Sequence, residues 1–91
     1  MKIGVPKEII SQEYRVSINP ETAKLLIESS HQLFIQKNAG VDSGYRDEEY
    51  ADLGCVILDN ATDIFNEADL IVKVKEPSLK EVEMMEGKML F

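Results

Sequence analysis

Three cationic side chains, Arg15, Lys73 and Lys75, have positions that suggest chemistry: the two lysines lie in an apolar stretch, and the arginine lies in a predicted loop. Lys73 and Lys75 alternate in the apolar stretch "LIVKVKEP", and alternate residues of a strand share one face of a sheet. Arg15 lies in "SQEYRVSINP", between the first predicted strand and the first predicted helix. A guanidinium and an ammonium group in one crevice would bind a small anion, such as a carboxylate, through charge-assisted hydrogen bonds.

Each of these cations also has a structural interpretation. Lysines on an edge strand discourage aggregation, and Arg15 could pair with Glu13 or another acid on the surface. Lys75 is the better anion-binding candidate of the two lysines, because only Glu76 separates it from Pro77, which cannot donate a ladder hydrogen bond and would end the strand. The residues alone leave both interpretations open.

Other reactive side chains are few. The single histidine, His31, follows the first predicted helix, where a histidine usually satisfies terminal carbonyl groups and interacts favourably with the helix dipole; general acid–base chemistry is the alternative. The single cysteine, Cys55, lies in the apolar run "CVILD" and is predicted to be buried. One cysteine excludes an internal disulfide and suits a reducing compartment.

Two kinds of cofactor site are not indicated. The glycines of "GVDSG" lack the third glycine of a dinucleotide fingerprint and do not lead directly from a strand into a helix. This stretch therefore predicts a turn, with anion binding by loop amides as the alternative. No histidine and cysteine spacing resembles a metal site.

The elements that must position the three cations alternate along the chain. Apolar runs predict strands near residues 2–6, 32–37, 55–59, 70–76 and 88–91. Helices are predicted from Pro20 with Asn19 as the N-cap, from about Asp47 to a stop at Gly54, after Asn60 or Thr62, and weakly over 78–86. This alternation predicts an α/β fold with a mostly parallel sheet and flanking helices. Sites in such folds lie beyond the carboxyl ends of the strands, which is where Arg15 and Lys75 are expected.

Size and charge restrict the class of protein. The chain has 91 residues, the length of one domain, and a formal net charge of −7. An acidic chain repels nucleic acid and anionic lipid, so neither is an expected partner. No apolar run approaches the roughly 18 residues of a membrane span, and "MKIGVPKEII" lacks the pattern of a signal peptide. We expect a cytoplasmic protein.

Several stretches, taken together and in order, resemble a known family. These are "MKIGVPKEI", "EYRVSINP", "SSHQLFIQKNAGVDSGYRDEEY", "ADLIVKVKEP" and "GKMLF". Over the whole of residues 1–91 they resemble the start of the NAD-dependent L-alanine dehydrogenases. The α-subunit of the proton-translocating transhydrogenase shares the opening, but the lysine and proline spacing of "KVKEP" looks more like the dehydrogenase.

The resemblance implies both a fold and an activity. Residues 1–91 would be the N-terminal part of a substrate domain, an incomplete doubly wound lobe of Rossmann-like or flavodoxin-like type. A second domain, absent from this sequence, would bind NAD. The family converts L-alanine reversibly to pyruvate and ammonium. Arg15 matches its arginine that holds the substrate carboxylate, and Lys75 matches the lysine that bonds the carboxylate or carbonyl end and helps polarise it.

The sequence also departs from the family pattern. The family's catalytic histidine follows "GKMLF" by a few residues and so lies beyond Phe91, together with the assisting aspartate and the NAD-binding domain. We therefore expect the 91-residue chain alone to be inactive. Ser30 and Asn38 stand where glycine is common, and Asn19 where threonine is usual. Lys73 has no family role and is expected to be solvent-facing or structural.

Three other functions remain open on the sequence. The chain could be a stand-alone module that binds a small anion through Arg15 and Lys75. It could be an interaction module that associates through a sheet edge near Phe91. It could also be a fragment of a transhydrogenase α-subunit. The resemblance to the dehydrogenases further implies a homo-oligomer, commonly a hexamer, whose contacts lie largely outside this segment.

Overall fold

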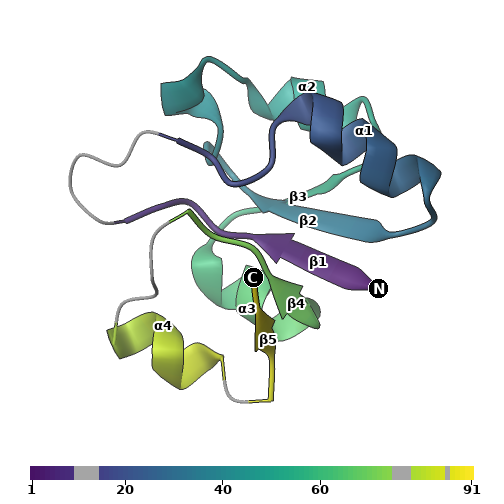
Figure 1. The fold of residues 1–91 in the computed structure, drawn as a ribbon. Coiled ribbons are helices and arrows are strands. Elements are labelled where there is room, and N and C mark those ends of the chain that lie inside the picture. Colours follow the sequence, from purple (N-terminus) through teal and green to yellow (C-terminus); the bar gives the residue numbers. More distant parts are fainter. Residues whose placement is uncertain (10–14, 75–78, 86) are drawn as a thin grey trace.

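A computed structural model describes residues 1–9, 15–74, 79–85 and 87–91 of the chain. These residues form five parallel strands, all in one sheet of order β3-β2-β1-β4-β5, with helices on both faces (Figure 1). The elements are β1 (Lys2–Val5), α1 (Pro20–Glu28), β2 (Gln32–Gln36), the 3-10 turn η1 (Val41–Ser43), α2 (Asp47–Ala51), β3 (Val56–Leu58), α3 (Ala61–Glu67), β4 (Leu70–Ile71), α4 (Leu79–Met84) and β5 (Met89–Leu90). The predicted α/β class is confirmed.

Asparagine side chains begin two of the helices. The Oδ1 atom of Asn19 accepts a hydrogen bond from the Thr22 amide at 2.8 Å, and Pro20 opens α1 as predicted. The Oδ1 atom of Asn60 accepts one from the Asp63 amide at 2.9 Å at the start of α3. Of the two residues that could have capped α3, Asn60 is the one that does.

The fourth strand is shorter than the predicted run of 70–76. Its regular pairing with β1 ends at Ile71, although the Val72 amide still donates to the Gly4 carbonyl at 3.0 Å. The next bond of a parallel ladder would run from the amide of residue 6 to the Val72 carbonyl. Residue 6 is proline, which has no N–H group, so the ladder stops there.

The second helix also ends earlier than predicted. Helix α2 finishes at Ala51, three residues before Gly54. Gly54 has φ +101° and its amide donates to the Ala51 carbonyl at 3.0 Å, so it forms the turn that leads into β3 rather than the residue directly after the helix.

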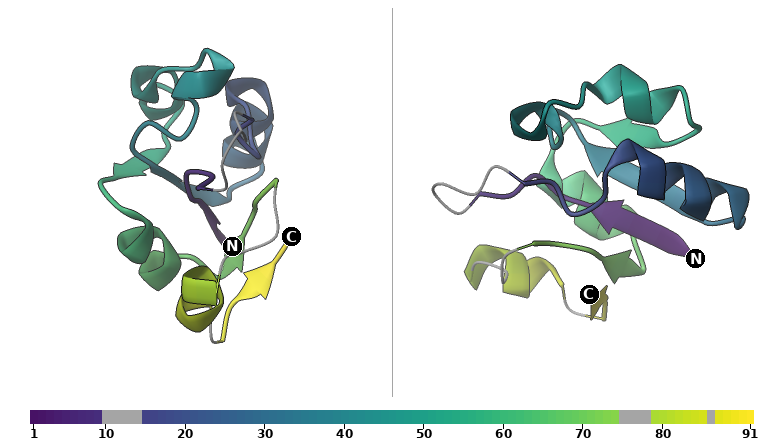
Figure 2. Two further views of the ribbon diagram at one scale, coloured as in Figure 1. Left: turned by 90° about the vertical axis from the view of Figure 1, so that its left-hand side faces the viewer. Right: turned by 45° about the horizontal axis from the view of Figure 1, so that its top comes forward.

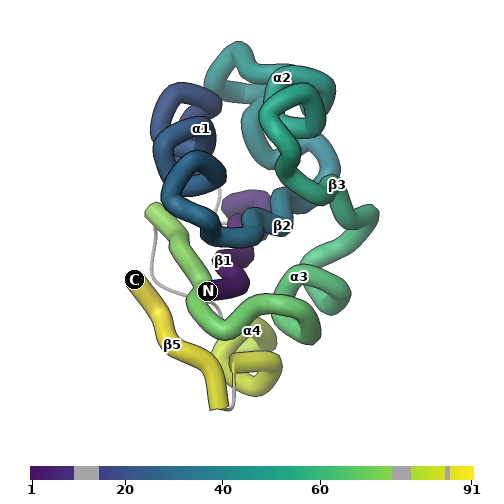
Figure 3. Tube along the Cα trace, turned by 90° about the vertical axis from the view of Figure 1, so that its right-hand side faces the viewer, coloured from purple at the N-terminus to yellow at the C-terminus, as the bar shows by residue number. Residues whose placement is uncertain are grey.

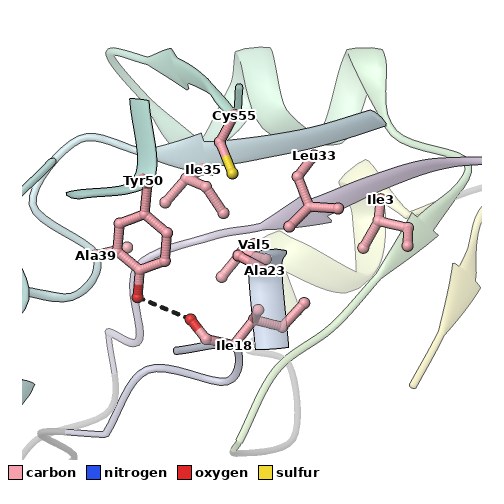
Figure 4. Packing of buried hydrophobic residues seen from close by; sticks show 9 residues of the cluster. All are labelled: Ile3, Val5, Ile18, Ala23, Leu33, Ile35, Ala39, Tyr50 and Cys55. Atoms are coloured by element: carbon pink, nitrogen blue, oxygen red, sulfur yellow. Dashed lines mark hydrogen bonds between the residues drawn. The ribbon is translucent and has the colours of Figure 1, made fainter. Parts of the chain in front are cut away.

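Two layers of helices enclose the sheet. Helices α1 and α2 lie on one face, and α3 and α4 lie on the other (Figures 2 and 3). The larger apolar cluster, under α1 and α2, consists of Ile3, Val5, Ile18, Ala23, Leu33, Ile35, Ala39, Tyr50 and Cys55 (Figure 4). The smaller cluster, on the α3 side, consists of Phe34, Ile64, Phe65, Ala68 and Ile71. Burial on both faces explains why the strands are continuous apolar runs.

Gly4 lets α3 lie directly on the central strand. A Cβ atom at this position would be 2.6 Å from the Ala68 Cβ atom and 2.8 Å from Ile64 Cγ2. Both distances are shorter than van der Waals contact allows, so any side chain at residue 4 would displace α3.

Among the described residues, no helix is long and apolar enough to cross a membrane.

Two of the departures from the family pattern occupy strained backbone positions. Ser30 has φ +71° and Asn38 has φ +66°, the left-handed region that glycine adopts without steric cost. In the family that the sequence resembles, glycine is common at both places. Asparagine tolerates this region better than serine, because its short amide hydrogen-bonds locally.

We predict that Ser30→Gly stabilises the chain by about 0.5–1 kcal/mol, because relief of left-handed strain exceeds the extra flexibility of glycine in the unfolded state. Ser29→Gly is the matched control, since Ser29 has φ −87° and gains no such relief. Urea unfolding of the three proteins measures the effect. A loss of stability in Ser30→Gly as large as that in Ser29→Gly would contradict this explanation.

Tyr50 carries the one hydroxyl group of the larger cluster. It donates a hydrogen bond to the Ile18 carbonyl at 2.7 Å, as the dashed line in Figure 4 marks, and its ring is fully buried. Burial raises the pKa of Tyr50 well above its ordinary value of 10.0, because the phenolate would lose its hydration, and the nearby Tyr45 adds to the shift.

This shift makes stability depend on pH. A raised pKa in the folded state means that the contribution of Tyr50 is complete below pH 10 and is lost as the pH rises above the unfolded-state pKa, by up to about 1.4 kcal/mol per pH unit. Tyr50→Phe costs about 1–2 kcal/mol at pH 7, because the Ile18 carbonyl loses its partner.

We therefore predict that the stability difference between the unaltered chain and Tyr50→Phe shrinks between pH 10 and pH 11. Urea unfolding at several pH values measures it, and Tyr45→Phe is the control that keeps Tyr50. A constant difference across this range would show that Tyr50 does not titrate with unfolding.

Candidate functional site

The strand order places a topological switch point between β1 and β4. From β1 the chain moves outward to β2 and β3 on one side, then returns to add β4 and β5 on the other (Figure 1). Connections that leave the carboxyl ends of β1 and β4 therefore separate to opposite faces and leave a crevice between them, where open α/β sheets bind ligands. Residues 6–9 and 15–19 leave β1 at this crevice, and residues 72–74 leave β4 there.

Arg15 lies at the carboxyl edge of the sheet, with its side chain exposed. The two residues that follow it fix this segment in place. The Val16 amide donates to Ser43 Oγ at 3.1 Å, which attaches it to the turn after β2. The Ser17 hydroxyl donates to the Val72 carbonyl at 2.7 Å, which attaches it to the segment after β4. The predicted location of Arg15 in a loop beyond the strand ends is confirmed.

Lys75 lies outside the described residues, which stop at Val74 before the chain resumes at Leu79. The segment that leads to it is described. The Val72 carbonyl, released from the sheet ladder by Pro6, accepts the Ser17 hydroxyl. The Lys73 amide donates to the Phe91 carbonyl at 3.2 Å, and the Val74 amide donates to Glu8 Oε2 at 3.1 Å. The backbone groups of Val72, Lys73 and Val74 are thus bonded to three different parts of the chain, at Ser17, Phe91 and Glu8 respectively.

Lys73 is not the edge lysine that one interpretation of the sequence expected. Strand β4 lies between β1 and β5, so it is not an edge strand, and the Lys73 side chain is only 1% exposed. Its Nζ atom lies 3.2 Å from Glu8 Oε1 and 3.3 Å from Glu81 Oε2. Of the two roles left open for Lys73, the structural one is correct and the solvent-facing one is wrong.

His31 and Cys55 are remote from the crevice. His31 immediately precedes β2, at the amino edge of the sheet, and its Nδ1 atom lies 3.5 Å from the Met1 amino group. The backbone amide of His31, rather than its ring, donates to the Leu26 carbonyl at the end of α1. Cys55 is buried as predicted, and burial raises the pKa of its thiol, which disfavours the reactive thiolate.

An apolar pocket of about 370 Å³ lies beside the crevice, on the α1 face of the sheet. Its lining residues are Ile3, Ser17, Ile18, Thr22, Leu26, Leu70, Val72 and Phe91. None of the described residues that line the pocket is charged, so they do not supply an anion site. The described residues also contain no group of three or more histidine, cysteine and acidic side chains that could hold a metal ion.

Sequence reasoning missed Ser17, Glu8 and Glu81. The apolar context of Lys73 was a usable signal, because a lysine buried among Ile71, Val72 and Val74 requires an opposite charge. Nothing in the sequence says which of the 17 acidic residues supplies it. Glu8 is 65 residues away along the chain, and only the adjacency of β1 and β4 brings the two together.

A family model matches almost the whole chain. The model describes "Alanine dehydrogenase/PNT, N-terminal domain" and matches residues 4–91. The alanine dehydrogenase of Methanococcus maripaludis is 45% identical over 92 aligned residues, which cover 100% of this chain and 25% of the relative. An NAD(P) transhydrogenase subunit alpha from Cereibacter sphaeroides is 40% identical over 85 residues, covering 93% of this chain and 16% of that protein.

Solved structures of an alanine dehydrogenase and a transhydrogenase are similar to this chain as well. An L-alanine dehydrogenase superposes with a TM-score of 0.89 at 40% identity, over 93% of this chain and 23% of that one. A transhydrogenase from Sinorhizobium meliloti superposes with a TM-score of 0.90 at 28% identity, over 99% of this chain and 27% of that one. The chain spans about a quarter of the length of the curated alanine dehydrogenases that it matches.

The Ser17 bond across the crevice yields a prediction. Ser17→Ala leaves the Val72 carbonyl without the hydroxyl donor and lowers the free energy of unfolding by about 1–2 kcal/mol. Ser29→Ala, at an exposed position after α1, is the control and changes stability far less. Urea unfolding measures both variants. Equal losses of unfolding free energy in Ser17→Ala and Ser29→Ala would mean that the Ser17–Val72 bond does not hold the segments after β1 and β4 together.

Proposed function

We propose that this chain, which belongs to the alanine dehydrogenase/PNT N-terminal domain family, is the N-terminal part of the substrate domain of an alanine dehydrogenase. In this proposal residues 1–91 bind the substrate and a further domain binds NAD. The complete enzyme would convert L-alanine, water and NAD⁺ to pyruvate, ammonium and NADH, with release of one proton. The reaction is reversible.

The observation that carries this proposal is the Ser17–Val72 bond at the switch point. At 2.7 Å it ties the segment that begins at Arg15 to the segment that continues towards Lys75. The segment that contains Arg15 and the segment that leads towards Lys75 therefore meet beyond the carboxyl ends of β1 and β4, the usual position of a ligand in such a sheet. The sequence resemblance assigns a substrate role to these same two residues.

The chemistry of each residue follows from its charge. Arg15 presents a planar guanidinium group that can form two parallel hydrogen bonds with the carboxylate of pyruvate or L-alanine. Lys75 would bond the carboxylate or carbonyl end of the substrate. A cation near the carbonyl oxygen polarises the C=O bond and favours attack by ammonia in the direction of amination.

NAD would be bound outside residues 1–91, since this sequence contains no G-x-G-x-x-G fingerprint. NAD supplies the hydride acceptor when it is bound. The family resemblance also assigns the catalytic histidine to the sequence that follows Phe91. Our proposal therefore includes that the 91-residue chain alone does not turn over, and that the complete enzyme is a cytoplasmic homo-oligomer, commonly a hexamer.

A transhydrogenase α-subunit is the second candidate, favoured by the TM-score of 0.90 to the Sinorhizobium meliloti protein. Two chimeras separate the candidates. In one, residues 1–91 replace the matching segment of the Methanococcus maripaludis alanine dehydrogenase; in the other, they replace that of the Cereibacter sphaeroides subunit. We expect alanine-dependent NADH formation by the first chimera. A folded but inactive first chimera alongside an active second one would reverse the assignment.

We predict that Arg15→Ala and Lys75→Ala each lower kcat/KM for pyruvate in the dehydrogenase chimera by roughly 30- to 1000-fold, equivalent to about 2–4 kcal/mol for a lost charged hydrogen-bond partner. Arg46→Ala and Lys24→Ala are the matched controls, because both side chains are exposed and lie on α1 or at the start of α2. Steady-state reduction of pyruvate with ammonium and NADH measures all four.

Lys73→Ala is not a suitable control for this comparison, because Lys73 is buried between two carboxylates. Losses in Arg46→Ala and Lys24→Ala that equal those at Arg15 and Lys75 would show that general charge, rather than a substrate site, accounts for the effect.

A further inference from the structure

The segment that leads from Arg15 into α1 is bonded to the region that follows β2. The segment belongs to no helix or strand, so its buried backbone groups need partners elsewhere in the fold. The Val16 amide donates a hydrogen bond to Ser43 Oγ at 3.1 Å. The Ile18 carbonyl accepts one from the Tyr50 hydroxyl at 2.7 Å (Figure 4). These partners are 27 and 32 positions away along the chain, so tertiary structure places the segment.

Ser43 lies in a turn that is itself well defined. Its amide donates to the Gly40 carbonyl at 3.0 Å, and Gly44, with φ +89°, ends the turn. Gly40 packs directly on Tyr50, because a Cβ atom at residue 40 would lie 2.9 Å from Tyr50 Cε2. The turn and Tyr50 therefore form one packed unit, and this unit bonds the segment before α1 at two of its residues.

The bond to Ser43 bears directly on Arg15. The peptide unit between Arg15 and Val16 is planar, so the Cα atom of Arg15 and the N–H group of Val16 lie in one plane. An acceptor that holds this N–H group restrains the plane, and with it the point from which the Arg15 side chain starts. Ser43 can thus influence the guanidinium group through the backbone.

A purely structural role is the alternative for Ser43. A single neutral hydrogen bond contributes only modestly to the stability of a fold. Loss of a structural bond would act on the domain as a whole, whether or not Arg15 is present. Loss of a positioning bond would act on the contact between Arg15 and the substrate carboxylate. The two roles therefore differ in whether the effect of Ser43 depends on Arg15.

We propose that Ser43 is a positioning residue for Arg15 and acts through the Val16 amide. This gives the turn "GVDSG" a role at the substrate site, because the turn orients the segment that carries the carboxylate-binding side chain. The inference rests on the proposed function, since it takes Arg15 to hold the substrate carboxylate.

A double-mutant cycle in the dehydrogenase chimera tests the proposal. We expect Ser43→Ala to lower kcat/KM for pyruvate by about tenfold, mainly through KM, since small misplacements of a binding group are costly. In the Arg15→Ala background the same change should lower kcat/KM by no more than roughly twofold, because Ser43 then has no guanidinium group to position. The comparison measures dependence on Arg15, so it holds whatever further contacts the Ser43 hydroxyl makes.

Two further variants identify the bond itself. Ser43→Thr keeps a hydroxyl acceptor and should restore most of the activity with pyruvate. Replacement of Val16 by its α-hydroxy acid, through cell-free translation, converts the peptide bond into an ester. This ester removes the N–H donor, leaves the Ser43 side chain unaltered and should reproduce the loss in Ser43→Ala.

The controls separate positioning from damage to the fold. KM for NADH should stay constant in every variant, and melting temperatures show whether each protein is folded. Ser29→Ala removes an exposed hydroxyl after α1 and should leave kcat/KM for pyruvate unchanged. If Ser43→Ala does not fold, the cycle with Arg15→Ala is measured with the ester instead.

Equal losses of kcat/KM from Ser43→Ala with and without the Arg15 side chain would overturn the proposal and leave Ser43 a structural residue. An unchanged kcat/KM in the ester variant would overturn it as well. Arg15→Ala in the same assay separates the two claims. If it weakens pyruvate binding and Ser43→Ala does not, only the positioning role fails; if it has no effect, the proposed function itself fails.

Discussion

The absence of a side chain at Gly4 is the constraint from which much of the architecture follows. Helix α3 lies so close to β1 that a Cβ atom at residue 4 would overlap Ala68 and Ile64. Because α3 leads within three residues into β4, the depth of this helix sets where β4 meets β1. The residues after β4 approach the crevice and include Lys73, which is buried against Glu8 and Glu81, so the packing of a helix on one face affects the geometry of the crevice at the sheet edge.

A proline then ends the pairing of β1 with β4 at the crevice. Pro6 cannot continue the ladder beyond Val5, and the Val72 carbonyl is released to accept the Ser17 hydroxyl. The crevice between β1 and β4 is therefore formed where the strands stop pairing, and the Ser17–Val72 hydrogen bond joins its two sides. The same principle applies below it, where Glu8 rather than a strand receives the Val74 amide.

Local chemistry made the element boundaries at Asn19, Pro20 and Asn60 predictable, because a cap or a fixed φ acts within three residues of itself. The alternation of apolar runs and helices likewise predicted the α/β class. The length of β4 and the end of α2 were not predictable, since the first depends on Pro6 in a neighbouring strand and the second on a turn at Gly54. Arg15 was identified as an anion-binding candidate from its place after a strand. The acidic partners of Lys73 were not identified from the sequence, because Glu8 is 65 residues away along the chain and only the tertiary fold brings the two side chains together.

The strand order has a consequence for synthesis of the chain. Strand β1 leaves the ribosome first, yet it occupies the middle of the sheet and needs β2 on one side and β4 on the other. After β2 is available, about 35 further residues must be made before β4 is complete, which at about 5–20 residues per second takes roughly 2–7 s. During this interval the nascent chain holds a half-paired apolar strand with an open edge, the kind of surface that chaperones recognise and that invites misassociation between neighbouring nascent chains. A fold that places this crevice beside its first strand thus completes the crevice only after β4 has been made.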